Sequence, residues 1–142
     1  MVAIITAQQF IDNGFRVSQQ LPQAELDRAA MDAFLCYVGK VSRITVTPNG
    51  QILHTPEQGE AAMQIAYILL LQRSAVATRA GGKLKLSPSL SDAGYPSQQD
   101  YSNADRLLRR LQEIGPVPVA GDVSKLVDDI AGIYYRNVNL SL

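Results

Sequence analysis

Residues 55–71 read TPEQGEAAMQIAYILLL, and this stretch decides the fold of the 142-residue chain. Its beginning is typical of a helix start, because Thr55 can cap, Pro56 fits the first helical position and Glu57 favours the positive end of the helix dipole. Over residues 61–71 apolar side chains face almost every direction, as in a helix that its neighbours bury on all sides. We therefore expect a central buried helix, either of one chain or of an assembly.

Two amphipathic helices are predicted ahead of this central helix. A capping-box pattern at Thr6 and Gln9 and a stop signal at Asn13-Gly14 predict a short helix. A longer helix is expected over about residues 22–42. Its inward face consists of apolar residues that recur at three- and four-residue spacing, namely Leu26, Ala30, Ala33, Phe34, Tyr37, Val38 and Val41.

Four segments have the composition of strands or loops. Residues 44–54 combine β-branched residues with a Pro-Asn-Gly turn, which predicts a small hairpin or an ordered loop. Residues 83–87 alternate polar and apolar side chains like a strand, and the tail 137–142 alternates in the same way, as expected of a strand that pairs with them. The segment 88–99 is rich in Ser, Pro, Gly and Gln and is expected to be a long loop.

Two further helices are predicted in the C-terminal part. One begins at Ser102 or Asp105 as the cap and ends at Gly115-Pro116, with an inward face of Leu107, Leu108, Leu111 and Ile114. The other covers about residues 122–136, and its inward face includes Leu126, Val127 and Ile130. Together the elements predict one mainly α domain over residues 1–142. We expect a compact helical bundle of about five helices around a buried central helix, with a small β-hairpin or extended arm.

The bulk composition narrows the function classes. Thirteen basic and thirteen acidic residues cancel, so the chain as a whole lacks the excess of Lys and Arg that phosphate binding uses. A neutral surface also does little to keep copies of the chain apart. The N-terminus lacks the pattern of a signal peptide, and the longest nearly apolar stretch, residues 61–71, is too short to span a bilayer. We therefore expect a cytoplasmic protein without membrane contact.

No catalytic, cofactor or metal site is predicted from the residues that could carry chemistry. The one cysteine, Cys36, lies in an apolar run and is expected to be a buried thiol. The one histidine, His54, is expected in a loop, because zinc and catalytic sites need partners of matching type. Asp128-Asp129 are neighbours on a predicted helix, do not face each other and are expected to be solvated. Gly81-Gly82-Lys83 lacks the spacing of a phosphate loop and is interpreted as a helix stop. Because none of these candidates predicts a catalytic site, the chain is not expected to be an enzyme.

One cationic stretch lies within this neutral chain. There is no acid between Glu60 and Asp92, whereas four cationic residues fall there: Arg73, Arg79, Lys83 and Lys85. These residues are candidates for contacts with a phosphate backbone or with an acidic patch on a partner. The alternative is that they complement the negative end of a helix dipole, and the sequence leaves both open.

Three patterns follow one another along residues 4–114. The first is an Ile-Thr-x-x-x-Phe segment at the N-terminus, and the second is an Ala-x-x-x-Tyr-Val face made by Ala33, Tyr37 and Val38. The third is the pattern Ala-x-x-x-Ala-x-x-x-Leu-Leu-x-Arg-Ser, made by Ala62, Ala66, Leu70, Leu71, Arg73 and Ser74. In this order of parts the chain resembles the head–tail connector (neck adaptor) proteins of tailed bacteriophages and prophages. It departs from the smaller members by the 88–99 loop and by the additional C-terminal helix.

The resemblance implies a structural subunit that forms a ring below the portal and extends the channel through which DNA leaves the capsid. Its expected partners are further copies of itself, the portal and tail-completion proteins, and DNA contacted without sequence preference. Its expected location is the bacterial cytoplasm or the virion. The cationic residues Arg73, Arg79, Lys83 and Lys85 would then line or flank the DNA channel.

Two other function classes stay open. A small helical regulatory or nucleic-acid-binding module would need a basic recognition helix, and no predicted helix is clearly basic on one face. A small enzyme would need polar groups that converge in a pocket, and spacing along the sequence predicts none.

Overall fold

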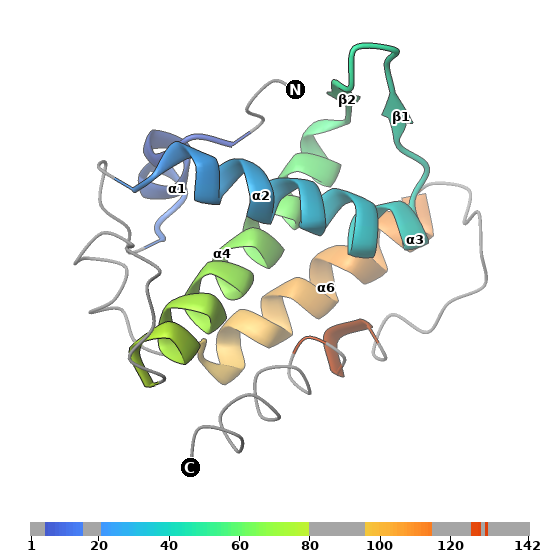
Figure 1. Cartoon of the computed structure of the whole chain (residues 1–142). Coiled ribbons are helices and arrows are strands. Elements are labelled where there is room, and N and C mark those ends of the chain that lie inside the picture. Colours follow the sequence, from blue (N-terminus) through green and yellow to red (C-terminus); the bar gives the residue numbers. More distant parts are fainter. Residues whose placement is uncertain (1–4, 16–20, 80–95, 115–125, 129, 131–142) are drawn as a thin grey trace.

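A computed structural model describes residues 5–15, 21–79, 96–114, 126–128 and 130, with side chains outside the description over 74–79 (Figure 1). Within these ranges the chain is mainly helical, with five α-helices, one π-helical segment and one two-stranded antiparallel sheet. The predicted mainly α bundle is therefore confirmed. No helix among the described residues is long and apolar enough to cross a membrane.

The first helix, α1, covers Ala7–Asp12 and has the predicted capping box. The Thr6 hydroxyl accepts a hydrogen bond of 3.2 Å from the Gln9 backbone N–H, and the Gln9 side chain accepts one of 2.8 Å from the Thr6 N–H. The helix ends as predicted, and Gly14 follows with φ +89°, a conformation that glycine adopts without steric cost. Phe10 is fully buried, so the short helix contributes to the core.

The predicted long helix is a continuous helical run over residues 23–41, built from α2 (Gln23–Ala33), a π-helical segment η1 (Phe34–Val38) and α3 (Gly39–Val41). All seven residues of its predicted inward face are buried. The π-helical turn was not predicted. It brings the Phe34 carbonyl oxygen within 3.0 Å of the place where a Cβ of residue 39 would lie, so glycine fits there without displacing backbone.

The expectation of a buried thiol at Cys36 is wrong, because Cys36 is exposed. Consecutive residues of a helix cannot all face one side. Phe34, Tyr37 and Val38 take the inward positions of this segment, so Leu35 and Cys36 fall on the outer face.

A small hairpin connects this helical run to the central helix, which resolves the predicted choice between a hairpin and an ordered loop. Strands β1 (Thr45–Val46) and β2 (Ile52–Leu53) pair antiparallel. Gly50 in the turn between them has φ +84°, as a tight turn of this kind requires.

The central helix, α4, covers Pro56–Arg79, crosses α2 and runs alongside α6 (Figure 1). Thr55 caps it: its hydroxyl accepts a hydrogen bond of 3.2 Å from the Gln58 N–H, and the Gln58 side chain accepts one of 2.9 Å from the Thr55 N–H. Every residue from 61 to 72 except Met63 is buried. The predicted all-round burial is therefore confirmed, and elements of the same chain supply it.

The next described helix, α6, covers Gln98–Ile114 and begins earlier than predicted. Ser97 and Asp100 form its capping box. The Ser97 hydroxyl accepts a hydrogen bond of 3.2 Å from the Asp100 backbone N–H, and the Asp100 carboxylate accepts one of 2.8 Å from the Ser97 backbone N–H. Ser102 and Asp105 are therefore interior helix positions rather than caps, and the expected loop does not extend to residue 99. The signal for the correct start was present one turn upstream.

The inward face of α6 is formed by Leu107, Leu108 and Leu111, as predicted, whereas Ile114 is 63% exposed and not inward. Ile114 is the last residue of the helix. Residues 126–128 and 130 are helical, and Leu126, Val127 and Ile130 are buried as predicted. The predicted helix stop at Gly81-Gly82, the strand 83–87, most of the loop 88–99 and the tail strand 137–142 lie outside the described residues.

Candidate functional site

Of the four cationic candidates, the structure describes the side chain of Arg73 alone. Its guanidinium forms an ion pair with the carboxylate of Asp32, which joins α4 to α2. The two side chains are 29% and 42% exposed, so the pair lies at the edge of the helix packing. The backbone of Arg79 belongs to the last turn of α4, and its side chain, Lys83 and Lys85 lie outside the described residues. The charge of Arg73 is thus compensated within the chain.

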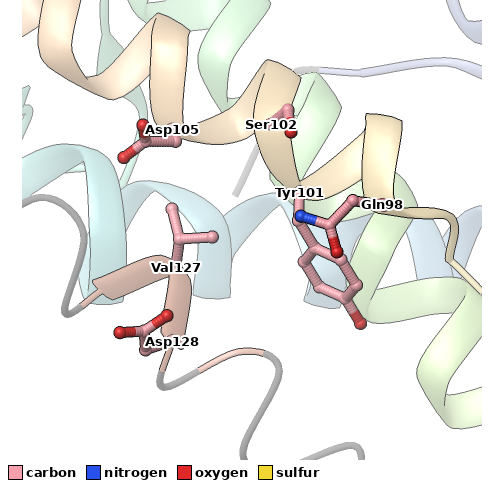
Figure 2. Close-up of a pocket in the computed structure, with 6 residues that line it drawn as sticks. All are labelled: Gln98, Tyr101, Ser102, Asp105, Val127 and Asp128. Carbon is pink, nitrogen blue, oxygen red and sulfur yellow. The ribbon is translucent and has the colours of Figure 1, made fainter.

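A polar pocket of about 210 Å³ lies between α6 and the helical residues 126–128. Figure 2 shows Gln98, Tyr101, Ser102 and Asp105 projecting from α6, with Val127 and Asp128 opposite. Val127 lies between the two carboxylates, so they do not converge on one point (Figure 2).

Two polar groups of this pocket have contacts elsewhere in the bundle, whereas the second carboxylate oxygen of Asp105, Oδ1, is buried without a hydrogen-bond partner among the described residues. One carboxylate oxygen of Asp105 accepts a hydrogen bond of 3.0 Å from Nε of Arg109, one helical turn further along α6. The Tyr101 hydroxyl accepts one of 3.4 Å from the Gln72 amide of α4. A general acid and base acting together need two groups within hydrogen-bond reach of one reacting atom. The described lining does not show two groups arranged in that way. Asp128 is exposed, as predicted.

A second pocket, of about 190 Å³, lies where the end of α1 meets α4 and α6. Its apolar lining includes Phe15, Met63 and Leu107, and its polar lining includes Asn13, Glu60, Gln64, Asn103 and Arg106. Phe15 is held in place by neighbouring rings, since its centroid lies 5.5 Å from that of Phe10 and 4.6 Å from that of Tyr67. Sequence reasoning missed this pocket, because its residues come from three separate segments.

His54 lies between β2 and α4 and is exposed, which confirms the expectation of a loop residue. Its ring centroid is 5.1 Å from that of Phe34, and its Nδ1 is 3.0 Å from the Thr55 carbonyl oxygen. In the part of the chain that the structure describes, no group of three or more His, Cys, Asp or Glu residues is arranged to hold a metal ion.

Among the residues whose side chains the structure describes, large apolar side chains reach the surface at four positions: Leu35 is 50% exposed, Val46 51%, Leu53 56% and Ile114 63%. The elements that carry them are neighbours. The segment η1 continues into α3, the end of α6 packs against α3, and the hairpin follows directly, all on the right-hand side of Figure 1. We call these four residues the apolar end. Isolated exposed apolar residues are common, but several on adjacent elements are typical of a contact surface for another protein.

Comparison with models of protein families, with curated proteins and with solved structures gave no match to this chain.

Proposed function

We propose that this chain is a structural assembly subunit, and specifically a phage or prophage head–tail connector that forms a ring below the portal. The observation that carries the assembly part is the apolar end. Four large apolar side chains among the described residues are each at least half exposed and lie on adjoining elements, with Val46 and Leu53 on opposite faces of the hairpin. Covering them with another protein surface removes apolar area from water, which favours association.

The neutral charge of the chain supports the same proposal. With thirteen basic and thirteen acidic residues, copies do not repel one another over long distances. A ring requires identical copies to contact one another through two different surfaces of each copy. Low net charge favours such packing at the high local concentration of an assembling particle.

The connector part of the proposal rests on the resemblance in the order of elements. Seven residues that carry this resemblance are buried, on the helical run 23–41 and on α4, which pack against each other: Ala33, Tyr37, Val38, Ala62, Ala66, Leu70 and Leu71. The pattern thus corresponds to the packing of the bundle. Other copies, the portal and tail-completion proteins, and DNA are the proposed partners, in the bacterial cytoplasm and in the virion.

Electron microscopy of the purified chain tests the assembly part directly. We expect closed rings of uniform diameter. Replacing Leu53 and Ile114 by Ser should abolish them, because both side chains are more than half exposed and contribute little to the core of a single chain. Exchanging the exposed polar residues Gln8 and Gln99 for Ser provides a matched control that should leave the rings intact. A field of single chains at all concentrations, or rings unaffected by the apolar exchanges, would overturn this part.

A contact with DNA is proposed for Arg79, Lys83 and Lys85, because Arg73 is already paired with Asp32. Reversing these three charges should reduce DNA retention in particles, since each phosphate contact depends on a cation. Reversing Arg109 and Arg110 on the exposed face of α6 is the matched control. Equal DNA retention in both variants would contradict the proposed channel contact.

A further inference from the structure

We propose that the pocket between α1, α4 and α6 binds the zwitterionic form of a small apolar amino acid. The pocket encloses about 190 Å³, which is below the roughly 300–1,000 Å³ of sites for drug-sized ligands. Liquid water occupies about 30 Å³ per molecule, so the space matches about six waters. The ligand is therefore a small molecule with few non-hydrogen atoms.

The charges around the pocket select a ligand that carries both signs. Glu60 on α4 and Arg106 on α6 both line it, and neither has an ion-pair partner among the described residues. A ligand with only a positive charge is attracted by Glu60 but repelled by Arg106. A ligand with only a negative charge is attracted by Arg106 but repelled by Glu60. A zwitterion satisfies both, with its ammonium group on Glu60 and its carboxylate on Arg106, which can bind a carboxylate through two parallel hydrogen bonds.

The lining of the pocket is more polar than apolar, and it places a short apolar wall next to polar groups. Phe15 and Met63 provide an apolar wall, and the flexible thioether of a methionine adapts to ligands of different shape. Gln64 lies deeper and is only 4% exposed, with its side-chain N–H donating a long hydrogen bond of 3.3 Å to the Asp100 carbonyl. A buried amide in the lining provides fixed hydrogen-bonding groups that orient a ligand. Because Glu60 and Arg106 come from different helices, a bound zwitterion would link α4 to α6.

Calorimetric titration of the whole chain with three related compounds tests this site. Leucine carries both charges, isopentylamine lacks the carboxylate and 4-methylpentanoic acid lacks the amine. We expect saturable binding of leucine with a Kd on the order of 1 mM, since so small a ligand buries little area. Each single-charge compound should bind at least roughly tenfold more weakly, because it leaves one charged group without its partner.

Variants locate the binding in this pocket. Glu60→Gln and Arg106→Gln should each weaken leucine binding by roughly tenfold, and both residues are exposed, so the fold does not depend on them. Glu113→Gln and Arg110→Gln change the same charges on the exposed face of α6 outside the pocket and should leave the Kd unchanged. No saturable binding of leucine, equal binding of a single-charge compound, or unchanged binding in both pocket variants would overturn the proposal.

Discussion

The side-chain amide of Gln72 donates a hydrogen bond of 2.8 Å to the backbone carbonyl oxygen of Ile130, 58 residues further along the chain. Gln72 is 5% exposed and lies on the central helix, so this bond ties the C-terminal helical residues to the middle of the bundle. The same amide reaches the Tyr101 hydroxyl at 3.4 Å. One buried glutamine thus connects α4, α6 and the chain around residue 130.

Replacing Gln72 by Met should loosen the C-terminal helical residues while the rest of the bundle stays folded. The change keeps most of the volume but removes the donors, and loss of a buried hydrogen-bond partner costs about 1–3 kcal/mol. Hydrogen exchange of the amides at 126–130 should become faster. Gln99→Met, at an exposed position of α6, is the control that should leave this exchange unchanged. Equal protection in the two variants would contradict the proposed tie.

The packing of the central helix predicts a large effect at Leu70. This side chain is completely buried, so Leu70→Ala removes packed methyl groups and leaves a cavity, which costs about 2–5 kcal/mol. Leu53→Ala should cost far less, because Leu53 is 56% exposed. Urea unfolding of both variants measures the free energy of unfolding. Similar losses would show that α4 is not the centre of the core.

The cap of the central helix can be tested at Thr55. Thr55→Ala removes the hydroxyl that accepts from the Gln58 N–H and should lower the free energy of unfolding by about 1 kcal/mol. Thr55→Ser keeps the hydroxyl and should restore nearly all of this loss. Thermal unfolding of the two variants compares them. If serine were as destabilising as alanine, the capping interaction would not be the cause.

The ion pair between Asp32 and Arg73 should contribute little energy, because water reaches both side chains. A double-mutant cycle with Asp32→Asn and Arg73→Gln should give a coupling of about 0.5–1 kcal/mol, which decreases as salt is added. A coupling that is zero at low salt would show that Arg73 is free to serve the channel contact first predicted for it.

The exposure of Cys36 predicts a reactive surface thiol on the native chain. A thiol reagent such as Ellman's should modify Cys36 completely without denaturant, at a rate close to that of the unfolded chain. The control is the same reaction in urea. Modification that requires unfolding would support the burial expected from the apolar run.

Local signals in the sequence predicted most of the helical architecture. The predicted capping box at Thr6 and the predicted cap at Thr55 each act between residues three apart, so their outcome depends little on the rest of the chain. The inward faces of the helical run 23–41 and of α4 followed from helical periodicity, and nearly all of their residues are buried. The start of α6 was predicted at Ser102 or Asp105, because both residues are of types that commonly cap helices, whereas Ser97 and Asp100 form the cap upstream of them.

Features that depend on distant contacts were not predictable from one sequence. The ion pair of Arg73 with Asp32 joins residues 41 positions apart in the sequence. It compensates the charge of one of the four cationic residues that were predicted to contact DNA or a partner. The pocket lined by Glu60 and Arg106 forms between helices, so predicting it would require knowing how α4 packs against α6. The outward position of Cys36 was available from a helical projection of residues 34–38, but the apolar composition of the run concealed it.

The absolute mass of the chain in solution, measured by light scattering after size exclusion over a wide concentration range, tests the central claim most directly. Assembly through the apolar end predicts a closed multimer whose mass is a fixed multiple of the single-chain 15.4 kDa and stays constant at high concentration. A mass of one chain at every concentration would contradict it and would favour a regulatory or nucleic-acid-binding module.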